Sequence, residues 1–233
     1  MAKAQKRTKA GQFKSNRSAG VDNPQAIAGR NRSRYALERL WDRAVAQNKT
    51  NIRQSEARAW MRKAAEGVRD TRKRLLSDVP PERMKTRVTP GKLYYYEYSA
   101  YYYEVEKTLP YYDMYPLAFP IKQEGDKLLV LSMHYLPPRT RAKLMDALLN
   151  IASDSVFNEK TRILMSYKLL NASSKYKEFA PCLKYHRLDR VKTKFIEVPA
   201  NEWYFAMFLP LARFKGASSQ KVFNDSAKAI SKR

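Results

Sequence analysis

The sequence is poor in the residues that most often carry out chemistry. It contains one cysteine, two histidines and seven glycines among 233 residues. A single thiol, Cys182, excludes an internal disulfide and a zinc site built on several cysteines, and it suits a reducing compartment. We expect it to be a small buried apolar side chain. Neither phosphate-binding pattern, G-x-x-x-x-G-K-[ST] or G-x-G-x-x-G, occurs, which excludes the nucleotide-binding classes that depend on them.

Long apolar runs are missing as well. No stretch approaches the roughly 20 apolar residues that a membrane helix needs, and the first residues lack the apolar segment of a signal peptide. We therefore expect a protein made in the cytoplasm, with no membrane partner.

Acidic residues are scarce relative to basic ones. The chain has 46 Lys and Arg but 22 Asp and Glu, which gives a formal net charge of +24 and a pI near 10.1. Residues 1–90 hold 23 of the basic residues and 8 of the acidic ones. Such an excess predicts either a polyanionic partner or an assembly that supplies the opposite charge.

The composition divides the chain into four parts. Residues 1–32 form a basic extended arm with hardly any large apolar side chains, so alone it should be disordered. Residues 33–89 form a helical N-terminal extension, with one helix capped by Ser33 and a second running from Ser55 to Leu76. Residues 90–214 form the core domain, after a proline-rich connector. Residues 215–233 form a basic C-terminal tail.

The core domain carries the strand patterns. Strands are predicted over residues 93–98, 116–122, 128–134 and 194–198, and Gly125-Asp126 indicates a hairpin. Helices opening at Pro138 and capped by Asn158 lie between the third and the last strand, and Arg141 is expected to point outward. We therefore predict an α+β fold. It is a small SH3-like, partly open β-barrel with inserted helices, preceded by two N-terminal helices and a basic disordered arm.

Tyrosines are concentrated at the start of the core domain, where ten of the 16 lie between residues 93 and 115. Because side chains alternate along a strand, we expect about half of those in the first strand to face the core. The remaining aromatic residues, with two tryptophans of the N-terminal helices, are candidates for a subunit interface. They are Tyr101, Tyr102, Tyr103, Tyr111, Tyr112, Trp41 and Trp60.

No catalytic site is predicted. His134, at a strand end, is expected to be structural, and His186 is expected to belong to a basic surface. A nuclease would need converging carboxylates, but Asp113, Glu124 and Asp126 lack the Glu-x-Lys that completes the common pattern, and Asp113 suits a turn. We expect no enzyme, no metal, no cofactor and no small-molecule substrate.

Nucleic-acid binding is better supported than catalysis. Basic side chains neutralise phosphates, and tyrosine rings can stack on bases. No recognition-helix or zinc-finger spacing occurs, so only a general electrostatic contact follows. The candidate contacts with nucleic acid or an acidic partner are Lys3, Lys6, Arg7, Lys9, Lys14, Arg17, Arg30, Arg32, Arg62, Lys63, Arg69, Arg72, Lys73 and Arg74.

Three segments of the core domain carry a resemblance to a known family. They are Pro90–Tyr94, Leu109–Leu117, and His134–Pro138 followed by Arg141–Leu148, with weaker similarity over residues 175–184 and 203–214. There the chain resembles structural proteins of contractile-tailed, T-even-like bacteriophages, of the DNA end protector or head-completion type. The insertion at residues 101–105 departs from that pattern.

The resemblance implies a non-enzymatic assembly protein, made in the host bacterial cytoplasm and built into a virion. Its partners would be other virion proteins and double-stranded DNA. Two alternatives remain open. One is a tail or baseplate component whose basic arms make protein contacts only, and the other is an RNA-associated protein of the ribosomal type.

Overall fold

The computed structural model describes residues 35–68, 71–152 and 154–231, without the side chains of residues 71 and 73. The chain separates into residues 1–34 and a compact unit of residues 35–233. The predicted basic arm and the helix cap Ser33 therefore lie outside the described residues. The predicted division at residues 32, 89 and 214 stays a prediction.

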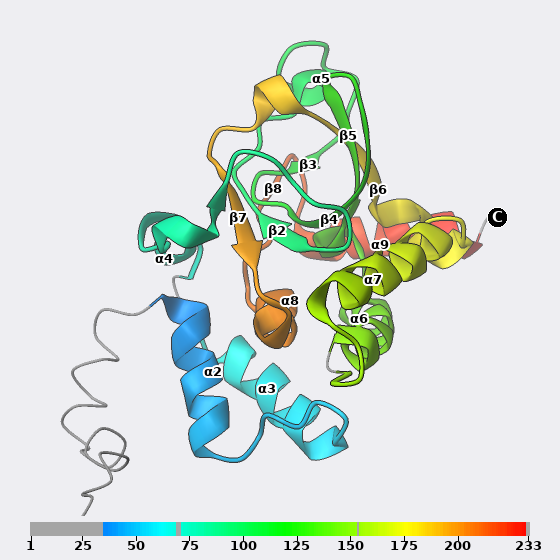
Figure 1. The fold of residues 1–233 in the computed structure, drawn as a ribbon. Helices are drawn as coiled ribbons and strands as arrows, with labels where there is room; N and C mark the ends of the chain where they lie inside the picture. Colours follow the sequence, from blue (N-terminus) through cyan, green and yellow to red (C-terminus); the bar gives the residue numbers. More distant parts are fainter. Residues whose placement is uncertain (1–34, 69–70, 153, 232–233) are drawn as a thin grey trace, which may run out of the picture. The chain divides into compact units, whose positions relative to one another are not determined.

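A six-stranded antiparallel sheet forms the centre of the compact unit (Figure 1). Its order is β1 (Met84–Lys85), β7 (Phe195–Val198), β2 (Leu93–Tyr95), β4 (Leu117–Glu124), β5 (Lys127–Ser132) and β6 (Leu183–Arg187). A second sheet pairs β3 (Tyr112–Asp113) with β8 (Phe214–Lys215). The α+β class is confirmed. The SH3-like barrel is not, because β1 and β6 are the edges of a sheet that does not close.

Local sequence signals located half of the strands. The four predicted strands correspond to β2, β4, β5 and β7, and the hairpin at Gly125 joins β4 to β5 with a positive φ of 60°. Strands β1, β3 and β8 have only two residues each. Strand β6 reads Leu-Lys-Tyr-His-Arg and is recognisable only from its pairing with β5.

Eight helices are described. They are α2 (Ala36–Ala46), α3 (Ser55–Glu66), α4 (Thr71–Ser77), α5 (Tyr101–Glu104), α6 (Pro138–Ala152), α7 (Glu159–Ser173), α8 (Trp203–Phe208) and α9 (Ser219–Ser231). Short 3₁₀ turns cover Pro81–Arg83 (η1), Met133–Tyr135 (η2), Lys177–Cys182 (η3), Leu188–Arg190 (η4) and Ala200–Glu202 (η5).

One helix prediction needs correction. The single helix expected from Ser55 to Leu76 is two helices, because α3 ends at the capping residue Gly67, a poor helix former. The segment of the predicted C-terminal tail contains α9, whose Val222 is buried. Asn158 caps α7 as predicted, since its side chain accepts a hydrogen bond from the Thr161 amide at 2.9 Å.

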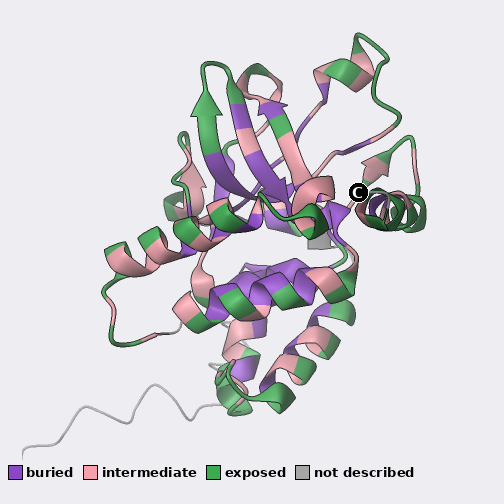
Figure 2. Ribbon diagram, turned by 90° about the vertical axis from the view of Figure 1, so that its right-hand side faces the viewer, coloured by how far each residue is buried: buried purple, intermediate pink, exposed green. Residues whose placement is uncertain are grey.

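One face of the sheet packs against helices. Leu93, Tyr95, Leu117 and Phe119 point from the strands into a core shared with α2, α3, α6 and α8. Figure 2 shows buried residues on the strands and on the helices that lie against them. Helix α8 lies at the centre of this layer, in contact with α2, α3 and α6.

The opposite face of the sheet is covered too, which corrects the prediction for the tyrosines. Tyr94, Tyr96 and Tyr98 form a second core with Phe195, and the Tyr96 and Phe195 ring centres are 4.9 Å apart. Tyr95 is buried in the first core, so both alternating sets are buried. The reason is that Ala100 and Tyr112, which follow Tyr98 in the chain, pack in the same second core and cover this face.

Candidate nucleic-acid interface

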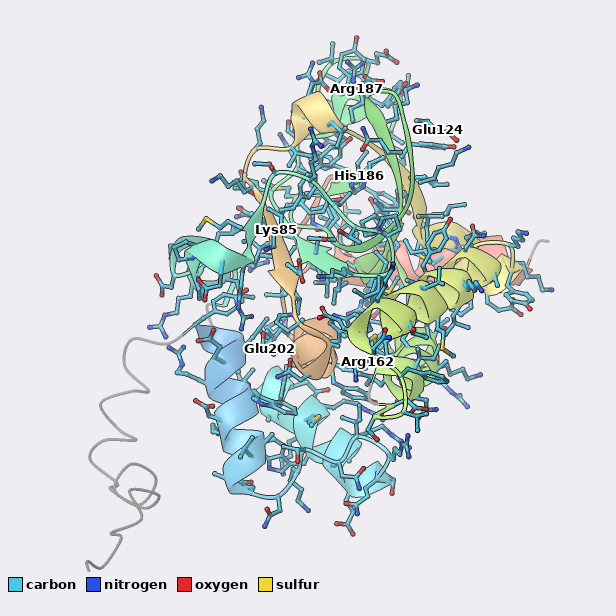
Figure 3. All side chains as sticks on the ribbon, in the orientation of Figure 1. Lys85, Glu124, Arg162, His186, Arg187 and Glu202 are labelled. Atoms are coloured by element: carbon cyan, nitrogen blue, oxygen red, sulfur yellow. The ribbon has the colours of Figure 1, made fainter. Side chains whose placement is uncertain are left out.

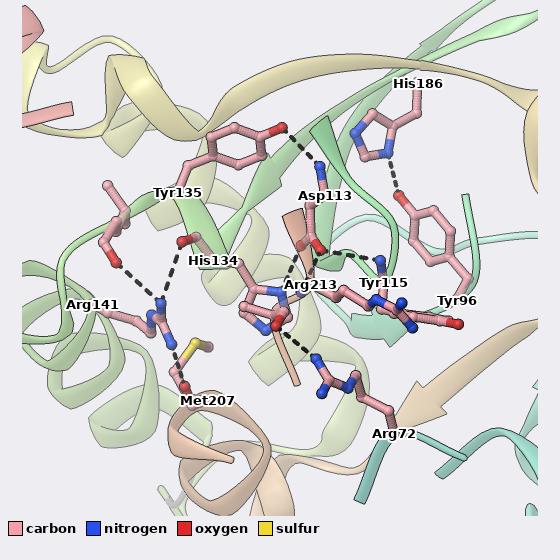
Figure 4. Close-up of polar contacts among 12 residues, drawn as sticks. Arg72, Tyr96, Asp113, Tyr115, His134, Tyr135, Arg141, His186, Met207 and Arg213 are labelled. Atoms are coloured by element: carbon pink, nitrogen blue, oxygen red, sulfur yellow. Dashed lines mark hydrogen bonds and ion pairs between the residues drawn. The ribbon is translucent and has the colours of Figure 1, made fainter. Parts of the chain in front are cut away.

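The described part of the chain contains one histidine–carboxylate pair, and it is closed to solvent. His134 Nδ1 lies 2.6 Å from Asp113 Oδ2, and neither side chain is more than 1% exposed. Asp113 Oδ1 accepts the amide of Tyr115 at 3.1 Å, which confirms the predicted turn, and also that of Arg213 (Figure 4). The pair joins η2 to the β3–β8 sheet. A substrate could not reach it, so its role is to hold the fold.

A buried arginine lies beside this pair. Arg141 donates to the carbonyl oxygens of Met207 at 2.7 Å and Leu136 at 3.1 Å. Burial lowers its pKa to about 10, so it remains charged at neutral pH. The expectation that Arg141 points to solvent is wrong, because these carbonyls draw the side chain inward from the first turn of α6.

The second histidine is buried as well. His186 Nδ1 lies 2.7 Å from the Tyr96 hydroxyl (Figure 4). The His186 ring also stacks on Tyr98, with 4.3 Å between ring centres. Burial lowers its pKa to about 3. The prediction of a basic surface is wrong for this residue, because side chains alternate along β6 and His186 is the one that turns inward.

The other groups that could carry chemistry are the possible metal ligands and the single thiol. Among the residues that the structure describes, no three His, Cys, Asp or Glu side chains gather in a way that could hold a metal ion. Cys182 is buried, as predicted, and burial raises its pKa to about 12.

The predicted basic residues of the second helix fall into two groups. Arg62 donates to the Tyr204 hydroxyl at 3.0 Å, and Arg72 donates to the carbonyl of Ala212 at 3.0 Å, so both hold the helices to the rest of the unit. Lys63 and Arg74 are exposed. Arg69, the side chain of Lys73 and the eight cations of the arm lie outside the described residues.

A cavity of about 390 Å³ opens between α2 and α3. We call it the Trp60 cavity, and it is lined by Arg43, Trp60, Lys63, Ala64, Gly67 and Val68. Arg43 was not among the predicted contact residues, because the sequence of this helix was interpreted only through its apolar face. A basic residue on the polar side of the last turn of α2 is the feature that could have indicated it, and the structure shows Arg43 to be exposed.

The other predicted interface residues are spread over the unit. The guanidinium carbons of Arg187 and Arg190 lie 4.7 Å and 4.9 Å from the centre of the Tyr101 ring. Arg187 lies at the same end of the sheet as Glu124, away from Glu202 (Figure 3). Tyr102 is exposed. The remaining predicted residues are the half-buried Tyr103, Tyr111 and Trp41, and Tyr112, which is buried and donates to Glu104.

The fold and its surface define a class of protein: a strongly basic α+β protein, in which the described histidines are buried and cations lie at the surface. Comparison with family models identifies it further. The model described as phage T4 terminal DNA protecting protein matches residues 27–231, and the chain belongs to that family. This match confirms the resemblance to T-even-like virion proteins. It also extends the similarity to residues 27–89, which the segments described above did not cover.

Two further comparisons found nothing: no curated protein and no solved structure matches the chain. In the described ranges, no helix is long and apolar enough to cross a membrane.

Proposed function

We propose that the protein binds the ends of phage DNA and protects them in the virion without catalysis. The observation that carries this proposal is membership of the terminal DNA protecting family over residues 27–231. The net charge of +24 supplies the electrostatic attraction to phosphates. The arm cations, with the exposed Lys63 and Arg74, are the proposed phosphate contacts.

The proposal includes neighbouring virion proteins as partners, in a head-completion role, and assembly in the host cytoplasm. The exposed ring of Tyr102 and the half-buried Tyr101, Tyr103, Tyr111 and Trp41 support a protein interface. Tyr112 is left out, because only 4% of its surface is exposed.

An exonuclease protection assay tests the proposal. The full-length chain is mixed with linear duplex DNA, an exonuclease that degrades from ends is added, and the surviving duplex is measured against protein concentration. We expect protection to saturate at a fixed ratio of protein to DNA ends. Closed circular duplex should compete poorly, because it has the phosphates but no end.

Two results would contradict the proposal. One is degradation at the same rate with and without protein. The other is competition by closed circles as strong as that of linear DNA, which would reduce the activity to general DNA binding.

A further inference from the structure

We propose that the Trp60 cavity binds the terminal nucleotide of a DNA end, with the base against the Trp60 ring and a phosphate beside Arg43 and Lys63. This inference rests on the proposed function and assigns it a place on the surface. Such a site would distinguish an end from the interior of a duplex, which the net charge cannot do.

The indole ring is placed to receive a base. Trp60 is half-buried, and its ring packs nearly perpendicular to that of Phe205, with ring centres 6.3 Å apart and an interplanar angle of 82°. The ring therefore has one fixed neighbour in the core while it also lines the cavity. A base stacked on an aromatic side chain strengthens binding by roughly 5- to 150-fold.

The cavity is large enough for a small ligand such as a nucleotide. Its volume of about 390 Å³ falls within the roughly 300–1,000 Å³ of small-molecule pockets. The small side chains of Ala64 and Val68 leave this space open beside the ring.

The charge at the cavity favours an anion. Arg43 and Lys63 are both exposed, and within the described part of the chain neither side chain forms an ion pair or a hydrogen bond. Their neighbours Arg58 and Arg62 are engaged, by Asp146 and Tyr204 respectively. Among the described residues, no carboxylate lines the cavity. These two cations are thus available to a phosphate.

Charge also argues against the chain's own arm as the occupant. Residues 1–32 carry Lys and Arg with a single acidic residue, Asp22. Such a segment would be repelled by the two cations. An acidic peptide of a neighbouring protein would satisfy the cations but would leave the indole ring unused, so a nucleotide fits the whole site better.

End selectivity follows from base stacking. An internal base must leave the stack and its partner before it can enter a pocket, whereas a terminal base has a neighbour on one side only. The cost of placing a base against Trp60 is therefore smallest at a terminus.

The experiment measures the affinity of the full-length protein for a short duplex with free ends and for a closed circular duplex at the same salt. The test variant is Arg43→Gln/Lys63→Gln, and the matched control is Lys168→Gln/Lys228→Gln, which removes the same charge from exposed positions of α7 and α9. We expect the test variant to lose about tenfold in affinity for ends. For closed circles it should match the control. Thermal unfolding verifies that both variants fold.

A second variant addresses the ring. Trp60→Phe keeps an aromatic face and should retain at least half of the end preference, whereas Trp60→Leu should lose it. Binding of ends should quench tryptophan fluorescence in the native protein and not in Trp60→Phe.

Three results would overturn the inference. In the first, the test variant loses as much affinity for closed circles as for DNA ends. In the second, its affinity for DNA ends is unchanged. In the third, an acidic peptide binds in the cavity and the affinity of the protein for DNA ends stays the same. In each of these cases end protection by the native protein could still hold. If the native protein failed to protect DNA ends, that result would instead contradict the proposed function itself.

Discussion

Arg83 forms a two-point ion pair with Glu202, with Nη1 2.6 Å from Oε2 and Nη2 2.8 Å from Oε1. Nη2 also donates to Glu38 at 2.9 Å, and the guanidinium lies 4.9 Å from the centre of the Tyr35 ring. One side chain thus connects α2, the connector before the sheet, and the turn before α8. Only 2% of Glu202 is exposed.

Removal of Arg83 should destabilise the protein strongly. Arg83→Met leaves the Glu202 carboxylate buried without its partner, which typically costs about 3–5 kcal/mol in the free energy of unfolding. Urea denaturation measures this. The double variant Arg83→Met/Glu202→Met should recover much of the loss, because it removes the buried charge as well.

Lys221→Met is the control for this prediction. Lys221 pairs with Asp225 on the exposed face of α9 at 3.0 Å, and we expect almost no change in stability. Equal stabilities of Arg83→Met and Lys221→Met would show that the buried pair does not hold the helices to the sheet.

Stability should fall as the pH is lowered, and His186 should account for part of the fall. Burial lowers its pKa from 6.5 to about 3 in the folded protein. Between these values the unfolded chain binds a proton at His186 that the folded protein does not, so lower pH favours unfolding. The contribution is about 1.4 kcal/mol per pH unit.

The variant His186→Gln isolates this effect. Urea denaturation at about pH 6 and about pH 4 should show that the native protein loses about 2.5 kcal/mol more than the variant over that interval. Parallel losses in the two proteins would mean that His186 is protonated in the folded state.

Gly91 allows α7 to lie directly against the start of β2. Its φ is +89°, and a Cβ at this position would lie 2.5 Å from the carbonyl oxygen of Ile163. Gly91→Ala should therefore destabilise the protein by more than about 4 kcal/mol, an unusually large effect for one methyl group. Thermal or urea unfolding gives the value.

Gly125 offers a matched control for the backbone strain. It also has a positive φ, +60°, but nothing lies within 4 Å of an added Cβ. Gly125→Ala should cost only about 1–2 kcal/mol. A similar cost for both substitutions would contradict the close approach of α7 to Gly91.

Salt should weaken DNA binding, and the cations of residues 1–32 should contribute to the dependence of the affinity on salt concentration. Removal of one phosphate contact lowers the slope of log affinity against log salt by about 0.9. Substituting Lys3, Lys6, Arg7 and Lys9 with Gln in the full chain should therefore reduce the slope by more than the same substitution of Lys160, Lys168, Lys175 and Lys228. Fluorescence anisotropy at several salt concentrations provides the slopes, and equal slopes would exclude the arm from the interface.

Local patterns predicted those parts of the fold that depend on neighbouring residues. The hairpin at Gly125, the cap at Asn158 and the placing of α6 and α7 between strands all follow from short-range signals and are confirmed. The open sheet could not be foreseen, because strand β6 has a polar sequence and pairs only through β5. The burial of Arg141 was hidden for a similar reason, since Met207 lies 66 residues away from it.

The excess of positive charge, the absence of phosphate-binding loop motifs and the resemblance to phage virion proteins can be read from the amino-acid sequence, because these are properties of composition and of short segments. Which of the described cations remain available to a ligand depends on the three-dimensional fold. Arg62, Arg72 and Arg141 are engaged by distant groups, whereas Arg43 and Lys63 stay exposed beside Trp60. Folding does not change the formal net charge of the chain. Whether a given Lys or Arg side chain can bind a ligand, however, depends on its contacts with residues far apart in the chain.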